Sequence, residues 1–160
     1  MKFKGTIIIT DPCYVIRAEH HGTKGITEND WDYCDCGDSM EKLGINIYMT
    51  ESTEYGDWSC TTFKGNIEDF YTDESKEHLH VEVSNKLGQF CADAGLVSVF
   101  LLDEVKSYNP DVEEFIKKHP WCFTTINDFD GDVEIKSIPE IGVSVIGKGN
   151  INFFTFQTGF

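Results

Sequence analysis

The stretch Gly88–Leu102, Gly-Gln-Phe-Cys-Ala-Asp-Ala-Gly-Leu-Val-Ser-Val-Phe-Leu-Leu, contains the longest apolar run of the chain, residues 96–102. The run is short, rich in β-branched and aromatic residues, and almost free of polar alternation, which is typical of a strand buried on both faces. Asp93-Ala94-Gly95 just before it predicts a sharp change of direction, because Gly95 can adopt a positive φ. Other elements must therefore pack on both sides of this strand.

Further strands are predicted on either side of the apolar run. Asn85–Gly88 is expected to be a turn, and Gly147–Asn150 is a tight hairpin signal between the last two strands. The β-branched or alternating segments that predict strands are Phe3–Thr10, Ile45–Thr50, Trp58–Phe63, His78–Val83, Trp121–Ile126, Val133–Ile138, Ile141–Ile146 and Ile151–Gln157.

Two helices are expected to pack on these strands. Thr27–Cys36 starts with a threonine that is followed three residues later by an aspartate, a spacing that resembles a capping box. Asp111–His119 follows an Asn-Pro pair, carries an apolar stripe at i, i+3, i+4 and stops at Pro120. The sequence therefore predicts a single α+β domain over residues 1–160, with a mainly antiparallel twisted sheet or half-barrel and two packed helices.

Charge is the most informative bulk property of the chain. The net charge is −15, from 28 acidic and 13 basic side chains, and residues 24–82 alone carry −11. Such a field repels nucleic acid and anionic membranes within the Debye length of about 8 Å, so neither is an expected partner. The charge either serves solubility or forms an acidic face that docks on a basic protein surface. No apolar run approaches the roughly 18 residues of a membrane helix and no signal peptide is recognisable, so a cytoplasmic location is expected.

The acidic face supplies the candidate partner-binding residues. Aromatic residues near it are included because aromatic side chains are enriched among interface anchors. The candidates are Glu28, Asp32, Asp35, Tyr55, Trp58, Glu68, Asp69, Asp73 and Glu74.

Metal-binding patterns are weak. The six cysteines have irregular spacings and are expected to be free thiols. Cys34-Asp35-Cys36 could join Cys60 and a histidine around zinc, but the pair is closer than zinc ligands usually are. Asp128–Glu134 resembles a calcium loop with its glycine in fourth instead of sixth position, so an aspartate-rich hairpin turn is favoured. No catalytic residue, bound metal or cofactor is predicted from these patterns.

Four polar signatures remain: Thr10–Tyr14, Tyr55–Trp58, Cys91–Gly95 and Phe156–Phe160. Together they resemble a set of small, mostly uncharacterised proteins common in phages and prophages, which share Asp-Pro-Cys-Tyr, Tyr-Gly-Asp, Asp-Ala-Gly and Gln-Thr-Gly motifs. The chain departs from that pattern at Trp58, where a small residue is expected. The resemblance implies a viral or mobile-element origin and brings no catalytic mechanism with it.

Two functions follow as hypotheses. The first is an acidic phage-type inhibitor that binds and occludes a basic, nucleic-acid-binding surface of a host protein, with a defence nuclease as the class of partner that best fits the charge. The alternative is a metal- or nucleotide-dependent enzyme, or a small-ligand-binding protein, that uses Asp11, Asp57 and Asp93. Each of these aspartates lies near a predicted strand end and within two residues of a glycine or proline. If the three strand ends converge, the carboxylates could bind a divalent ion or a small ligand, although turn capping alone also explains each of them.

Overall fold

The computed structural model describes residues 1–15, 47–49, 58–70, 85–92, 97–138 and 142–159. Eight strands in these ranges form one sheet in the order β2-β5-β1-β6-β7-β8-β3-β4, and every neighbouring pair is antiparallel. The strands are β1 (Lys2–Thr10), β2 (Ile47–Met49), β3 (Trp58–Lys64), β4 (Lys86–Ala92), β5 (Ser98–Leu101), β6 (Thr124–Ile138), β7 (Gly142–Gly149) and β8 (Phe153–Gly159).

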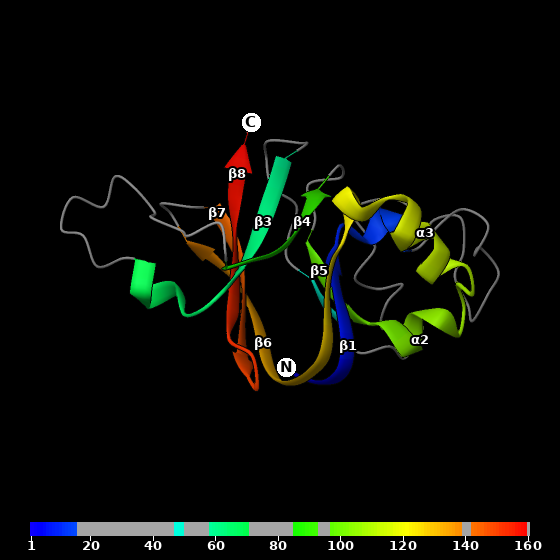
Figure 1. Ribbon diagram of the computed structural model, residues 1–160, viewed down its shortest axis with the longest axis horizontal. Helices are drawn as coiled ribbons and strands as arrows, with labels where there is room; N and C mark the ends of the chain where they lie inside the picture. Colours follow the sequence, from blue (N-terminus) through cyan, green and yellow to red (C-terminus); the bar gives the residue numbers. More distant parts are fainter. Residues whose placement is uncertain (16–46, 50–57, 71–84, 93–96, 139–141, 160) are drawn as a thin grey trace.

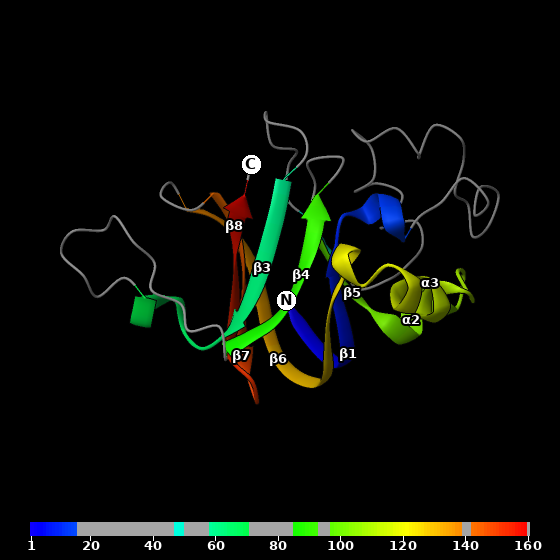
Figure 2. The same ribbon diagram turned by 45° about the horizontal axis from the view of Figure 1, so that its top comes forward.

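The sheet is curled into a half-barrel, with β1 and β5 on one side and β3, β7 and β8 on the other (Figures 1 and 2). The bend lies in β6, which pairs with β1 up to Asp132 and with β7 from Gly131 onward. Gly131 pairs with Gly149 at this point, and a Cβ built on Gly131 would lie 2.3 Å from the carbonyl oxygen of Lys148. Glycine is therefore required where the two strands cross this closely.

Strand β4, at the edge of the sheet beside β3, lies near the first part of β6. This proximity connects the β3 side of the half-barrel with the β1 side. A Cβ built on Gly88 would lie 3.1 Å from the hydroxyl oxygen of Thr124, and the hydroxyl of Thr62 on β3 lies 3.2 Å from that of Thr124. The side chain of Thr124 on β6 thus lies against Gly88 of β4 and hydrogen-bonds with Thr62 of β3.

The apolar run of β5 is buried on both faces, as its sequence predicts. Val99 packs in the interior cluster with Ile9 and Phe153, whereas Phe100 packs on the outer face against Ile8. The expected strand ends one residue early, because Leu102 already begins a helix. The turn predicted at Asp93–Gly95 and the strand at His78–Val83 lie outside the described residues.

Two short helices, α2 (Leu102–Lys106) and α3 (Val112–Lys118), cover the outer face of β1 and β5 (Figure 1). The second matches the predicted helix Asp111–His119, with Asp111 as its N-cap residue. Asn109 does not cap it; its side chain amide donates to the carbonyl oxygen of Val15 at 3.1 Å. The other predicted helix, Thr27–Cys36, lies outside the described residues. No helix in the described ranges is long and apolar enough to cross a membrane.

Three 3-10 turns complete the described chain: η1 (Pro12–Tyr14), η4 (Ile67–Phe70) and η6 (Pro120–Cys122). A third small cluster places Ile67 of η4 against Phe63, Ile146 and Phe154 on the outer face of the β7–β8–β3 side.

Two local sequence predictions are wrong. Asn85–Gly88 is not a turn, because Lys86 already begins β4 and Gly88 provides space for Thr124. Asp128–Glu134 is not a hairpin turn, because β6 runs through it without interruption and pairs with β1 on one side. In both cases the glycine allows close packing between strands. When only the local sequence is considered, the same glycine resembles a turn signal.

A bulge in the β1–β6 ladder gives a testable consequence. Asp128 has φ 52°, the only non-glycine residue with a positive φ in the described ranges, and it lies opposite the register shift at Gly5. Asp128→Gly should leave the free energy of unfolding unchanged or raise it by up to about 1 kcal/mol, whereas Asp128→Val should lower it by about 1–2 kcal/mol. Denaturant melts measure both.

Asp130→Gly is the matched control, since it removes the same charge from an exposed position two residues along the strand. It should lower the free energy of unfolding by about 0.5–1 kcal/mol. Equal losses for glycine at positions 128 and 130 would contradict the assignment of backbone strain to Asp128.

Candidate functional site

Strand ends that belong to or adjoin the four sequence signatures lie at one end of the half-barrel. Thr10 pairs with Ser98, and Trp58 pairs with Ala92. Ser59 pairs with Gly159 at the end of β8. Figure 2 shows the start of β3 beside the ends of β4 and β8 at this end. We call it the signature rim, made of residues 10–14, 58–59, 91–92, 97–98 and 159.

Asp11 is a buried turn-capping residue on the signature rim. Its Oδ1 accepts a hydrogen bond from the backbone N–H of Cys13 at 3.0 Å, and its backbone carbonyl accepts one from Tyr14 at 3.2 Å. This is the geometry that an Asp-Pro sequence favours at the start of a helical turn. The carboxylate therefore has a structural role in the Asp-Pro-Cys-Tyr signature.

Hydrogen bonds from Thr10 and Ser98 attach this turn to its neighbours. The Thr10 hydroxyl donates to the carbonyl oxygen of Cys122 at 2.8 Å, and the Ser98 hydroxyl donates to the carbonyl oxygen of Thr10 at 2.7 Å. Both hydroxyls are buried, so these bonds hold η1, β5 and η6 together at the rim.

Asp57 and Asp93 lie outside the described residues, so whether their carboxylates meet Asp11 is untested. Their chain neighbours Trp58 and Ala92 do form a cross-strand pair. The convergence of strand ends is thus present at the level of the backbone. Within the described ranges, no group of three histidine, cysteine, aspartate or glutamate side chains could hold a metal ion.

The turn-capping interpretation of Asp11 makes a direct prediction. Asp11→Ala should lower the free energy of unfolding by about 1 kcal/mol or more, because the Cys13 N–H loses its acceptor. The melting temperature of the wild type should not change with millimolar magnesium, calcium or manganese. Thermal melts test both, and ion-dependent stabilisation that is lost in Asp11→Asn would favour the metal-site alternative.

No disulfide joins the four described cysteines, of which Cys60 and Cys122 are buried and Cys13 and Cys91 are half-buried. Cys60 packs in the interior apolar cluster beside Phe90. Its burial raises the pKa of the thiol, and the nearby Cys91 thiol adds to the rise. Cys34 and Cys36 lie outside the described residues, so the zinc hypothesis for them is untested.

The core should lose stability in alkaline solution. Burial raises the pKa of Cys60 from its ordinary 9.0 and, with the charge of Glu104 as a smaller cause, raises the pKa of the Tyr108 hydroxyl from 10.0. The folded protein therefore holds protons that the unfolded chain releases above these values, so stability falls as pH rises. We expect a loss of about 1 kcal/mol or more between pH 8 and 11.

Denaturant melts across this pH range measure the effect. The double variant Cys60→Val/Tyr108→Phe lacks both ionisable groups and should show a shallower decline. An unchanged slope in the double variant would mean that other groups cause the alkaline loss.

Few of the predicted partner-binding residues lie in the described ranges. Glu68 and Asp69 are exposed on η4, where Glu68 lies 3.8 Å from the Lys148 ammonium and Asp69 accepts a bond from Asn66 at 3.5 Å. Trp58 is the first residue of β3. The remaining candidates, Glu28, Asp32, Asp35, Tyr55, Asp73 and Glu74, lie outside the described residues.

The negative charge is unevenly distributed along the chain. The 99 described residues carry twelve acidic and nine basic side chains, a net charge of −3. The other 61 residues carry the remaining −12. Exposed ion pairs join several of the described charges, including Lys106 to Glu113 at 2.8 Å and Lys136 to Glu134 at 3.3 Å. The described half-barrel is therefore close to charge balance, and most of the excess belongs to residues 16–46, 50–57 and 71–84.

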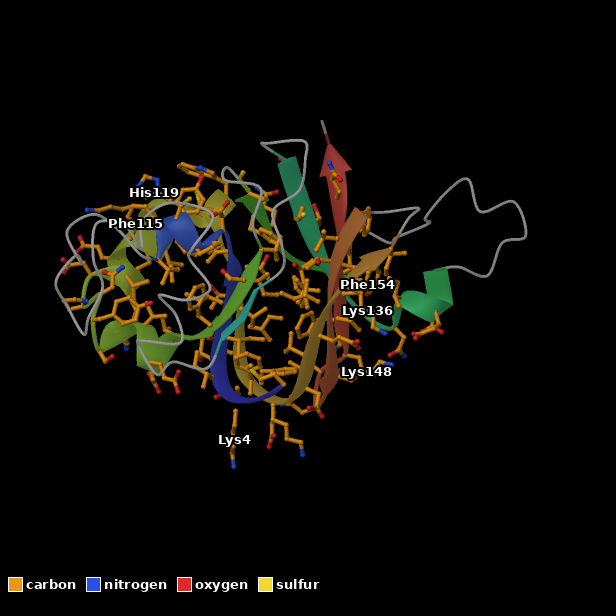
Figure 3. All side chains as sticks on the ribbon, turned by 180° about the vertical axis from the view of Figure 1, so that it is seen from behind. Lys4, Phe115, His119, Lys136, Lys148 and Phe154 are labelled. Atoms are coloured by element: carbon orange, nitrogen blue, oxygen red, sulfur yellow. The ribbon has the colours of Figure 1, made fainter. Side chains whose placement is uncertain are left out.

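Sequence reasoning missed one exposed aromatic residue. Trp121, expected within a strand, lies in η6 and is 49% exposed. Figure 3 shows Phe115 on α3 and His119 just after the end of that helix, both of which precede Trp121 in the chain. The signal that could have indicated it is the preceding Pro120, since proline at the start of a turn interrupts a strand.

No family model, curated protein or solved structure matches the chain.

Proposed function

We propose that the protein is a non-enzymatic inhibitor of the phage type, which binds a basic, nucleic-acid-binding surface of a host protein through its acidic segments. A defence nuclease is the class of partner whose groove best complements the charge. The protein would act in the cytoplasm of the infected or lysogenic host cell, as its resemblance to phage and prophage proteins implies.

The observation that carries the proposal is the separation of charge. A solubilising charge can be spread over any exposed surface, whereas here −12 of the net −15 belongs to residues outside the described ranges, and the described half-barrel is nearly neutral. Residues 50–57 come directly before β3 in the chain, and residues 93–96 come directly after β4. The adjoining strand ends, Trp58 and Ala92, pair with each other on the signature rim. Acidic segments anchored in a rigid sheet suit the recognition of a basic groove.

The mechanism would be electrostatic steering followed by steric occlusion. Opposite charges raise the rate of encounter by about 10- to 1,000-fold, and the effect falls steeply with ionic strength. Once bound, the half-barrel would cover the groove and exclude the phosphate backbone of a nucleic acid. No covalent chemistry is needed.

Capture of the partner from host lysate, followed by competition, tests the proposal. The protein that remains bound at moderate salt should be identified, purified and assayed for binding to its own nucleic acid. We expect stoichiometric inhibitor to displace the nucleic acid. A captured protein that binds nucleic acid and inhibitor at the same time, each with unchanged affinity, would contradict occlusion.

A metal- or nucleotide-dependent enzyme, or a small-ligand-binding protein, is the second candidate. It is favoured by a single observation, the pairing of Trp58 with Ala92, since these residues are the chain neighbours of Asp57 and Asp93. The capping role of Asp11 weighs against it. The metal-dependent melting experiment on Asp11 tests the metal-dependent form of this candidate.

A further inference from the structure

Trp121 is presented to solvent at one end of the half-barrel. At 49% exposure it is one of two exposed large hydrophobic residues among the side chains that the structure describes, and the other is Met1. It lies in η6, between the end of α3 and the start of β6. Tryptophan is one of the residue types most enriched among the hot spots of protein interfaces.

The indole is held in place by its neighbours. The ring of His119 lies 5.4 Å from that of Trp121 at 85°, and His119 in turn lies 4.4 Å from Phe115. Phe115 packs edge-on against the buried ring of Phe123 at 5.8 Å. An anchor that is already ordered loses little side-chain entropy on binding.

The backbone of Trp121 is attached to the signature rim. Its carbonyl oxygen accepts a hydrogen bond from the Cys91 thiol at 3.6 Å, and Cys91 is next to the last residue of β4. Trp121 is therefore attached to the end of the half-barrel at which β4 ends.

The charges of the chain just before Trp121 nearly balance, with a net charge of −1 for residues 111–119. Residues 111–119 contain three acidic residues and two lysines, and Lys118 lies 3.2 Å from Glu114. On the neighbouring helix, Lys106 is paired with Glu113 at 2.8 Å. The net charge of the whole chain, −15, favours the approach of a positively charged partner.

We propose that Trp121 is the anchor on which an arginine side chain of the basic partner stacks. The indole face attracts a guanidinium group by its quadrupole, and arginine is the cation that most often uses this contact. Arginine is also abundant on surfaces that bind nucleic acid. The inference rests on the proposed function and names a specific contact within it.

A titration with defined cationic peptides tests this contact. The probes are a ten-residue arginine peptide, a ten-residue lysine peptide and single-stranded oligothymidylate, added to ¹⁵N-labelled protein at low salt. Trp121→Phe assigns the indole N–H signal among the three tryptophans. We expect the arginine peptide to shift the Trp121 signal, and Trp121→Ala to weaken its binding by roughly threefold to thirtyfold.

A control variant and the comparison of the three probes show which part of the proposal is wrong if the expected result is not obtained. Asn127→Ala, an exposed neutral change further along β6, should bind the arginine peptide like the wild type. Peptide binding that does not depend on Trp121 would overturn the anchor and leave acidic docking intact, whereas a wild type that binds neither cationic peptide would overturn both. A Trp121 shift caused by oligothymidylate would identify a base-stacking site and overturn the arginine contact. Thermal melts confirm that each variant is folded.

Discussion

Replacing Gly147 with alanine is expected to lower the free energy of unfolding by about 3 kcal/mol, at the upper end of the usual range for overpacked cores. A Cβ at this position would lie 2.0 Å from Cε1 of Phe153, the residue with which Gly147 pairs across the β7–β8 ladder. The Phe153 ring is fully buried and packs against Phe129 at 5.4 Å, so it cannot move aside at low cost. Denaturant melts measure the loss.

The double variant Gly147→Ala/Phe153→Leu is the control, because leucine lacks the Cε1 and Cζ atoms that clash. Phe153→Leu alone removes buried ring atoms and should itself be destabilising. The two changes together should cost less than the sum of the single changes, as expected for residues in direct contact. Strict additivity would mean that the Gly147 substitution acts through the backbone and not through Phe153.

Reversing the charges of Glu68 and Asp69 to lysine is expected to slow association with the basic partner by about tenfold at low salt. These exposed residues lie in the acid-rich region 24–82, and Asp73 and Glu74 continue it along the chain. The dissociation rate should change less, since steering acts on encounter. Stopped-flow or surface-binding kinetics at several salt concentrations measure both rates.

Asp103→Lys/Asp130→Lys is the matched control, because it makes the same change in net charge at two exposed positions outside residues 24–82 and 111–121. Its effect on the association rate should be smaller, and each of these surface changes should alter the free energy of unfolding by only about 0.5 kcal/mol. Equal slowing by both pairs of reversals would indicate that only the total charge matters. An association rate that depends neither on salt nor on either pair of reversals would indicate that the charge serves solubility alone.

The strands and the second helix could be predicted from the sequence because their signals are local. The apolar run around Val99 and Phe100 indicates burial on two faces, and that is how β5 packs. The stripe of Val112, Phe115 and Ile116 likewise predicts α3, whose buried side contacts the outer face of the sheet. Such patterns depend only on residues close in the chain.

The errors arise where glycine meets a residue distant in sequence. Gly131 and Gly88 both look like turn residues locally, yet one is needed opposite Gly149 and the other beside Thr124. The strand order is equally non-local, since β4 and β5 are consecutive in the chain but six places apart in the sheet. Single-sequence patterns carry no information on such pairings.

The candidate site was only partly predictable for the same reason. The Asp-Pro-Cys-Tyr turn and the capping role of Asp11 follow from local chemistry. The approach of the strand ends at the signature rim depends on register, and the exposure of Trp121 depends on the packing of His119 and Cys91 around it. Neither can be derived from composition or spacing.

The position of β1 between β5 and β6 has a consequence during protein synthesis. Its partners are Ser98–Leu101 and Thr124–Asp132, so Ile7, Ile8 and Ile9 have no strand to pair with until the ribosome has translated most of the chain. At 5–20 residues per second, about 5–20 s pass before the first partner is made. A nascent chain that exposes this isoleucine run for seconds is a natural substrate for ribosome-associated chaperones, and its yield should depend on them more than its final stability suggests.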